Sequence, residues 1–350
     1  MIKRWAAVTT AILLLLSGCS HKEVHKKTSE KTNEIPKVEK QTEKDTSLPY
    51  QFPLTGIRSK EKTDGRAVAV MINNLPQARP QSGLNKADII YEILAEGNVT
   101  RFLAVFQSEK PEKVGPVRSA RSYYIELAKG LDSLYIAHGY SPEAKRMLQS
   151  GYIDNLNGME YDGTLFKRAS FRKPPHNSYI TYQNILKGAR LRHYQMTKTP
   201  AAFTFMTDEE SGKLSGRDVH SALVSYYGSR IFNARYDYDP TIGKYKRFST
   251  DVQTIDLETK APILLDNIFI VEMKHQIVDK SGRREIDMKS GGKAYLLQKG
   301  KLNEVEWKNL DGRIVPFLNG SEVPFVPGKT WVNIIPTEPG LLKSVKFNVQ

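Results

Sequence analysis

The chain contains a single cysteine, Cys19, and this one feature removes several classes of fold and site. An internal disulfide framework, a CxxC redox pair and a cysteine-based zinc site each need more than one cysteine. No cysteine nucleophile can lie in the folded body, because Cys19 stands close to the N-terminus. The fold must therefore rest on a hydrophobic core, for which the 39% hydrophobic content of the 350 residues is sufficient.

The residues around Cys19 predict where the protein works. Lys3 and Arg4 precede an apolar run, Ala6 to Leu16, that is shorter than the roughly 20 residues needed to span a bilayer. A positive start followed by such a run is typical of a signal peptide. The string LSGC, which ends at Cys19, resembles the bacterial lipoprotein signal. We predict a signal peptide over 1–18 and a palmitate-type lipid anchor at Cys19, on the extracytoplasmic face of the cell membrane. An ordinary signal peptide with an incidental cysteine is the alternative.

Composition divides the rest of the chain into three parts. Residues 19–49 are rich in Lys, Glu, Thr and Ser, cannot bury enough apolar surface to fold, and are predicted to form a disordered tether. Residues 50–205 alternate strand and helix patterns, which predicts an α/β sandwich domain. Residues 206–350 show short alternating runs between Gly, Pro and Asp-Gly turns, which predicts a smaller β-rich domain. The expected fold class is therefore α+β.

Apolar runs place the main elements. In the first domain we expect strands at 67–72, 101–107 and 133–137, helices at 118–129, 142–149 and 184–194, and either state at 87–94. In the second domain we expect strands at 244–248, 268–271, 294–297, 305–307 and 331–335, with hairpin turns at 281–282 and 311–312.

The formal net charge of +14 favours an anionic partner, such as phosphate, anionic lipid or cell-wall polymer. Because the body is predicted to lie outside the cytoplasm, we expect no nucleic acid as a partner. No HExxH, GxSxG, Walker or dinucleotide-binding motif occurs, so no metal site and no cofactor is predicted.

The first candidate binding segment follows the strand at 67–72. It is rich in amides and turn-forming residues, and loops after strands commonly carry binding groups in α/β sheets. Its candidate ligand-binding residues are Asn73, Asn74, Arg79, Gln81 and Ser82. The alternative is a structured turn whose amides satisfy the backbone.

Two carboxylates stand near an arginine in the next segment. Glu92 and Glu96 share a face whether 87–94 is a strand or a helix, and both are close to Arg101 in the sequence. Glu92 and Arg101 are candidate ligand-binding residues, and a buried Glu–Arg pair is the alternative.

The strongest candidate is the string GPVRSAR, which ends at Arg121. A helix opened by this Gly-Pro step would carry Arg118 and Arg121 on one face near the positive end of its dipole. Arginine forks bind phosphate or carboxylate in a bidentate manner. Two surface arginines paired with acids such as Glu92 are the alternative.

Histidines follow two further predicted elements. His138 ends a strand, and His176 and Asn177 lie in the loop KPPHNSY. A histidine at the end of a strand can act as a general base, but a lone histidine is more often structural. These three residues complete the set of candidate ligand-binding residues, and catalytic residues remain unassigned.

Four long strings carry a resemblance. MINNLPQARPQSGLNKADIIYEILAEGNVTRFLAVFQ, KVGPVRSAR, KPPHNSY and VPFVPGKTWVNIIP are similar to the YerB-type lipoprotein family of Gram-positive bacteria, over about residues 50 to 336. That family is described as a two-part domain of unknown function. The resemblance implies a lipoprotein with two domains and implies no reaction or catalytic residue.

The order of a second set of features is similar to that of the LytR-CpsA-Psr phosphotransferases, which hold a polyprenyl pyrophosphate with arginines. Arg101, the stretch Arg118 to Arg121 and the string YIAHGYSPEA follow one another in that order. The chain has no clear counterpart of the acidic metal-binding segment of those enzymes.

Three functions follow from these patterns. The leading hypothesis is an anchored protein that binds an anionic envelope ligand or a protein partner. The second is an envelope enzyme acting on phosphorylated lipid-linked or wall polymers. The third is an adaptor that docks a membrane protein through an apolar patch near Trp331 or residues 316–327.

Overall fold

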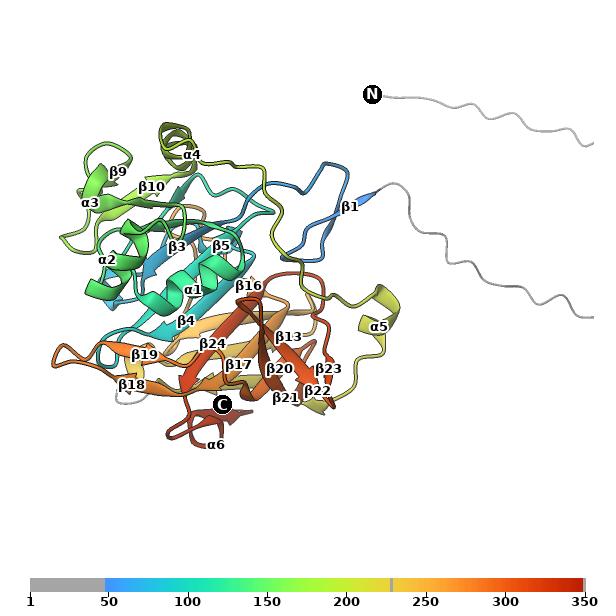
Figure 1. Cartoon of the computed structure of the whole chain (residues 1–350). Coiled ribbons are helices and arrows are strands. Elements are labelled where there is room, and N and C mark those ends of the chain that lie inside the picture. Colours follow the sequence, from blue (N-terminus) through green and yellow to red (C-terminus); the bar gives the residue numbers. More distant parts are fainter. Residues whose placement is uncertain (1–47, 227–228, 349–350) are drawn as a thin grey trace, which may run out of the picture. The chain divides into compact units, whose positions relative to one another are not determined.

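The computed structural model describes residues 48–226 and 229–348 (Figure 1). The predicted signal peptide, Cys19 and nearly all of the predicted tether lie outside the described residues. The residues described all belong to one compact unit.

A mixed sheet of 12 strands dominates this unit. Its order is β23-β22-β21-β20-β17-β24-β4-β5-β3-β7-β8, and β11 pairs with β21. Its strands are β3 (Val68–Asn73), β4 (Ile89–Leu94), β5 (Thr100–Phe106), β7 (Leu134–Ala137), β8 (Asn155–Asn157), β11 (Arg217–Asp218), β17 (Asn267–Met273), β20 (Gly292–Gln298), β21 (Lys301–Leu310), β22 (Arg313–Leu318), β23 (Ser321–Glu322) and β24 (Thr330–Pro336).

The centre of this sheet joins the two halves of the sequence. β24 pairs in parallel with both β4 and β17, and Asn333 on β24 lies opposite Glu92 on β4. These central strands are apolar almost throughout because both of their faces are covered. The large sheet therefore contains strands from both sides of residue 205, and the domain boundary at 205/206 stays a prediction.

A second sheet is entirely antiparallel and lies in the C-terminal half of the sequence. Its order is β15-β14-β13-β12-β25, and β16 pairs with β14. Its strands are β12 (Ser221–Val224), β13 (Ala234–Asp239), β14 (Lys244–Ser249), β15 (Val252–Gln253), β16 (Leu264–Leu265) and β25 (Val345–Phe347). Three smaller sheets within the described residues use β1 (Tyr50–Gln51), β2 (Arg58–Ser59), β6 (Lys113–Val114), β9 (Phe166–Arg168), β10 (Ser178–Thr181), β18 (His275–Ile277) and β19 (Arg284–Ile286).

The helices are short, and the longer ones gather beside the first strands of the large sheet (Figure 1). They are α1 (Ser122–Gly130), α2 (Pro142–Gln149), α3 (Gly158–Tyr161), α4 (Tyr182–Leu191), α5 (Asp208–Gly212) and α6 (Leu341–Ser344), with 3-10 turns η1 (Pro76–Ala78), η2 (Leu84–Lys86) and η3 (Arg230–Phe232). Across the described residues, no helix has the length and apolar character that crossing a membrane requires.

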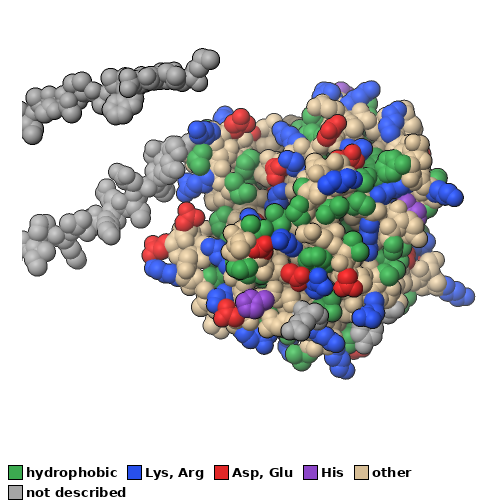
Figure 2. All heavy atoms as spheres, turned by 180° about the vertical axis from the view of Figure 1, so that it is seen from behind, with side chains coloured by type: hydrophobic (Ala, Val, Ile, Leu, Met, Phe, Trp, Pro, Cys, Tyr) green, Lys and Arg blue, Asp and Glu red, His purple; other side chains and the backbone are tan. Residues whose placement is uncertain are grey.

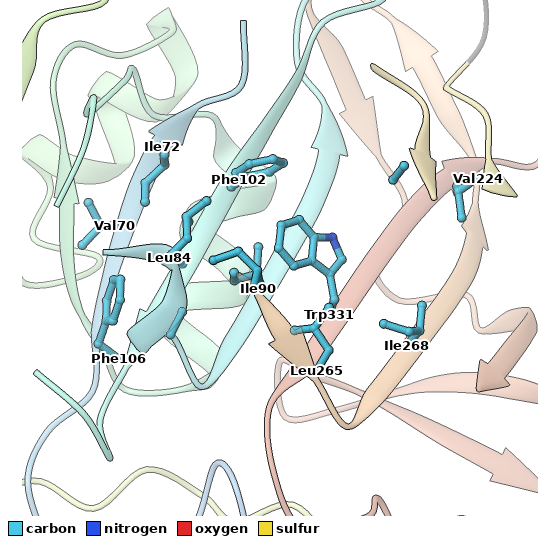
Figure 3. Close-up of a cluster of buried hydrophobic side chains, with 14 of the residues drawn as sticks. Val70, Ile72, Leu84, Ile90, Phe102, Phe106, Val224, Leu265, Ile268 and Trp331 are labelled. Atoms are coloured by element: carbon cyan, nitrogen blue, oxygen red, sulfur yellow. The ribbon is translucent and has the colours of Figure 1, made fainter. Parts of the chain in front are cut away.

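The core that joins the two large sheets is built around Trp331. Its ring packs edge-on against Phe102, with 5.1 Å between ring centroids, and Figure 3 shows Ile90 beside both. Val224 from the antiparallel sheet belongs to the same cluster (Figure 3). Trp331 is completely buried, so it offers no exposed patch of the kind the adaptor hypothesis requires at this position.

The predicted fold class is confirmed as a mixed α/β architecture with a separate antiparallel sheet in the C-terminal region. Residues 89–94 form a strand, which resolves the ambiguity at 87–94. The helix predicted at 118–129 begins only at Ser122, because Arg121 has extended backbone angles. Arg118 and Arg121 therefore do not share a helix face, and that prediction was wrong. The third helix covers 182–191 rather than 184–194.

Candidate functional site

Many of the predicted site residues lie at one edge of the large sheet. β3, β7 and β8 are parallel, so their carboxyl ends meet at this edge, where Asn73 and His138 stand. β5 is antiparallel to β3, so Arg101 near its start lies at the same edge, directly opposite Asn73. Binding groups in α/β sheets are commonly placed at such an edge.

Residues 117–120 form an extended segment that crosses this edge. The Arg118 N–H donates to the Met71 carbonyl at 2.9 Å, and the Arg118 carbonyl accepts from the His138 N–H at 2.9 Å. The Val117 N–H donates to the Ser178 carbonyl at 2.7 Å. The Ala120 carbonyl accepts the Ser141 N–H at 3.2 Å. The carbonyls of Arg118 and Ala120, which a helix would have paired with N–H groups four residues on, are therefore bonded to neighbouring segments, and the helix starts later.

Two of the three predicted arginines at this edge share one carboxylate, which leaves one net positive charge on the three groups. Arg101 Nη2 donates to both oxygens of Glu96, at 2.7 and 3.0 Å, and Arg121 Nη2 contacts the same carboxylate. The side chains of Arg101 and Arg121 are only 5% and 7% exposed. The alternative of an arginine paired with an acid such as Glu92 therefore holds for Arg121, with Glu96 rather than Glu92 as the acid.

Arg118 is different, because it has no carboxylate partner among the described residues. Its side chain makes one hydrogen bond, from Nη1 to the Pro175 carbonyl at 3.4 Å. Its Nε is buried and has no partner within the described chain. Burial, and then the like charge of Arg101, lower the pKa of Arg118 to about 10. An uncompensated, partly desolvated guanidinium is a group that an anion would stabilise.

His176 lies beside this guanidinium and is held by Asn73. The Asn73 Oδ1 accepts the Leu75 N–H at 3.0 Å, so its Nδ2 faces His176 and donates to Nδ1 at 2.9 Å. This contact leaves the proton of neutral His176 on Nε2, where it can donate to a ligand. Burial, and then the charges of Arg118 and Arg172, lower the pKa of His176.

His138 is hydrogen-bonded through both ring nitrogens. Arg168 Nη2 lies 3.0 Å from Nε2, and since arginine can only donate, Nε2 accepts. Nδ1 therefore carries the proton and donates to Ser178 Oγ at 2.8 Å. Burial lowers the pKa of His138, as do the charges of Arg168 and Arg118. In this arrangement His138 positions its neighbours, and its basic nitrogen is already occupied.

The loop that carries His176 is fixed by arginines that the sequence reasoning missed. Arg168 Nη1 donates to Asn177 Oδ1 at 3.2 Å and binds Asp162 through a 2.8 Å ion pair. Arg172 donates to the carbonyls of Ala78 and Pro80, which links this loop to the segment after β3. Both arginines lie just before the string KPPHNSY that contains His176. This closeness in sequence is the feature from which they could have been predicted to lie near His176.

The second group of predicted residues surrounds Glu92, whose partner is Arg247. The two side chains are completely buried and joined at 2.8 Å. The Glu92 carboxylate also accepts from Asn74 at 3.2 Å, from Thr100 at 3.0 Å and from the indole N–H of Trp331 at 3.2 Å. A Glu–Arg pair was the alternative weighed for Glu92 and Glu96 beside Arg101. Glu96 does pair with Arg101, whereas the partner of Glu92 is Arg247.

Arg247 could have been found from the alternation of its strand. The buried positions of β14 are Tyr245, Arg247 and Ser249. Because a buried arginine needs a counter-charge, an arginine at an inward position predicts a buried acid elsewhere in the chain. Nothing in the sequence says that this acid lies 155 residues away.

The remaining predicted residues belong to the loop between these two groups. Arg79 donates to the Asn74 carbonyl at 2.8 Å and to Asn74 Oδ1 at 3.1 Å. Gln81 donates to the Asn73 carbonyl at 2.9 Å. Ser82 stands apart and donates to Glu258 at 2.9 Å. Much of this amide-rich segment satisfies backbone and side-chain groups around it.

The charge around the extended segment is therefore positive on balance. The carboxylates nearest to it, Glu96 and Asp162, are each held by arginine. Across residues 48–226 and 229–348, no group of three or more His, Cys, Asp or Glu side chains is placed to hold a metal ion. The arrangement can bind and orient an anion through Arg118 and His176.

Comparison with known proteins places the chain in a family. The model of the DUF3048 N-terminal domain, a protein of unknown function, matches residues 54–195, and that of the DUF3048 C-terminal domain matches residues 223–332. The chain is 48% identical over 339 residues to a Bacillus subtilis (strain 168) protein described as "Putative lipoprotein YerB", covering 96% of each chain. A crystal structure of the YerB protein from Bacillus subtilis superimposes with a TM-score of 0.79 at 47% identity, over 85% of this chain and 99% of the other. The chain therefore belongs to the DUF3048 family, and it carries the two domains of unknown function in order along its sequence.

Proposed function

We propose that this protein is a lipid-anchored binding protein of the extracytoplasmic membrane face, and that Arg118 holds the anionic group of an envelope ligand. The observation that carries the proposal is the unpaired guanidinium of Arg118. Burying a cation without a partner is costly, so its position is best explained by a ligand that supplies the missing negative charge.

The neighbouring groups support an anion rather than a cation. His176 keeps a free Nε2–H beside Arg118, because Asn73 occupies its other nitrogen. Arg101 and Arg172 add positive charge behind these two donors. Phosphate and carboxylate both fit a guanidinium fork with a second N–H donor, and the excess of Lys and Arg over acids also favours their approach.

The test is calorimetric titration of the unlipidated chain from Ser20 onward with inorganic pyrophosphate. Arg118→Ala should lower the affinity about tenfold or more, since a charge-assisted hydrogen bond contributes about 1.5–3 kcal/mol. Arg118→Lys should recover part of the affinity, because lysine keeps the charge and loses the planar fork. The matched control is Arg190→Ala, an exposed arginine on α4. Equal pyrophosphate affinity in wild type and Arg118→Ala would refute the assignment.

The lipid anchor has its own test. Cys19→Ala should release the protein from the membrane fraction or leave it with an uncleaved signal, because the only acylation site of this type is lost. Metabolic labelling with a radioactive fatty acid provides the measurement. A Cys19→Ala protein that still carries label and stays in the membrane would show that the anchor is elsewhere.

A further inference from the structure

A pocket with a volume of about 380 Å³ lies between the loop after β3 and the β14–β15 hairpin. Arg118 and His176 are not among the residues that line it, so it is distinct from the proposed Arg118 site. Its lining residues are Pro76, Arg79, Pro80, Gln81, Ile231, Ser249, Thr250, Val252, Gln253, Thr254 and Ile255.

The walls of this pocket are mainly apolar. Pro76 and Pro80 come from the loop after β3, and Ile231, Val252 and Ile255 come from the antiparallel sheet and its connections. Ile231 is 45% exposed and Val252 is 73% exposed. Large aliphatic side chains left in water beside a cavity favour a ligand with an apolar portion.

The inner end of the pocket carries an excess of positive charge. Ser249 and Thr254 line it, and both hydroxyl oxygens accept hydrogen bonds from Arg247, at 2.9 and 2.8 Å. Arg247 therefore lies directly behind this lining, with Glu92 as its ion-pair partner. Arg79 adds a second guanidinium, so two cations share one carboxylate. Burial, and then the charge of Arg247, lower the pKa of Arg79 to about 10.

Three hydrogen-bond donors remain available here. Arg79 uses Nε and Nη2 to bind Asn74 and the Ile231 carbonyl, and its Nη1 makes no hydrogen bond within the described part of the chain. Ser249 and Thr254 accept from Arg247, so each keeps its own O–H to donate. The Glu92 carboxylate already accepts from four donors and does not compete for them.

We propose that this pocket binds a small single-chain amphiphile with a carboxylate head group. The head group lies against Arg79 and the two hydroxyls, where it supplies the missing negative charge. The chain lies along Ile231 and Val252, where it covers exposed aliphatic surface.

Octanoate is the probe, and the isosteric neutral octanamide tests the charge. Both are titrated calorimetrically into the unlipidated chain from Ser20 onward, below the concentration at which octanoate forms micelles. The affinity for octanoate should be at least about tenfold higher than that for octanamide, because only the carboxylate carries a negative charge that can pair with Arg79. Hexanoate should bind roughly fifteenfold more weakly than octanoate, since each buried methylene contributes about fourfold.

Two variants locate the site. Val252→Asp places a negative charge on an exposed rim position that tolerates a polar side chain, and should weaken octanoate binding about tenfold. Ile277→Asp is the control, because Ile277 is 58% exposed on a different hairpin, and should leave octanoate affinity unchanged. Arg79→Ala should remove the preference for octanoate over octanamide. The proposal is overturned if octanoate does not bind, if it binds no better than octanamide, or if Val252→Asp binds it as well as wild type.

Discussion

Glu92–Arg247 and Arg118 show two ways in which one chain places a guanidinium out of water. Arg247 is completely buried, faces a carboxylate at 2.8 Å and lies 4.4 Å from the Trp331 ring centre. Arg118 is only partly buried, and within residues 48–226 and 229–348 it has no acid beside it and makes a single long side-chain hydrogen bond. Figure 2 shows many other Lys and Arg side chains spread over one face of the surface, where water satisfies them.

The difference separates a charge that joins parts of the fold from a charge that has no carboxylate partner among the described residues. Arg247 reaches from the antiparallel sheet to the central strand β4 of the large sheet, so its pairing joins the two sheets. Tyr236 on β13 and Tyr226, which follows β12, both donate to Asn333 on β24, which reinforces that junction. Arg118 joins no such network, and its removal leaves no buried acid unpaired.

The largest expected effect comes from breaking the buried pair. Glu92→Gln should lower the free energy of unfolding by about 3–5 kcal/mol, because Arg247 would remain buried without its counter-charge. Urea denaturation at pH 7 measures the loss. The double variant Glu92→Gln/Arg247→Met should recover part of the stability, because it removes both charges. If Glu92→Gln alone is as stable as wild type, the Glu92–Arg247 pair does not contribute to the free energy of unfolding.

Arg121 tests the intermediate case. It shares Glu96 with Arg101, so Arg121→Ala leaves that carboxylate still paired. We expect a loss of about 1.5–3 kcal/mol, the usual contribution of a charge-assisted hydrogen bond in a largely buried site. Thermal and urea unfolding of Arg121→Ala and Arg190→Ala provide the comparison. A loss as large as that of Glu92→Gln would mean that Arg101 alone does not hold Glu96.

The strands of both halves could be predicted from the sequence, because short apolar or alternating runs such as 268–271 report burial directly. The continuity of the large sheet could not, because pairing β24 with β4 joins residues more than 200 positions apart, as in Trp331 opposite Ile90. The helix at 118–129 failed locally for a similar reason. The N–H groups of His138 and Ser141 bind the Arg118 and Ala120 carbonyls that the first turn of this helix would have used, and no local pattern reveals them.

For the candidate site, too, the sequence indicated which residues are candidates but not how they pair. Residue type and clustering drew attention to Arg118 and His176, and the structure brings these two together beside Asn73. The sequence could not distinguish the unpaired Arg118 from the paired Arg121, because Glu96 is near both along the chain. Only the geometry of the extended segment decides which guanidinium meets the acid.

A half-buried histidine extends the comparison to pH. Both ring nitrogens of His275 on β18 are buried and without a hydrogen-bond partner in the described chain, and burial, with the charge of Arg284, lowers its pKa to about 3. Because the unfolded chain takes up this proton below about pH 6.5 and the folded chain does not, stability is lost as the pH falls through that value.

At pH 5.5 this single group should cost about 1.4 kcal/mol relative to pH 7.5. Urea denaturation of wild type and His275→Phe at both pH values gives the measurement, and the variant should lose less stability on acidification by that amount. An identical pH dependence in the two proteins would show that His275 titrates normally in the folded state.

The smallest expected change in stability is that of Arg118→Ala. Because no acid among the described residues pairs with Arg118, its removal should lower the free energy of unfolding by no more than about 0.5 kcal/mol, and relief of the unpaired burial acts in the opposite direction. The pKa of His176 should rise in this variant, since Arg118 is one of the charges that lower it, after burial itself. NMR titration of the His176 ring protons measures that shift while urea denaturation measures stability. A stability loss comparable to that of Arg121→Ala would place Arg118 among the structural arginines, because a side chain kept for a ligand should not be needed by the empty fold. If Arg118→Ala is as stable as wild type and the pKa of His176 rises, Arg118 acts on His176 electrostatically and does not stabilise the fold.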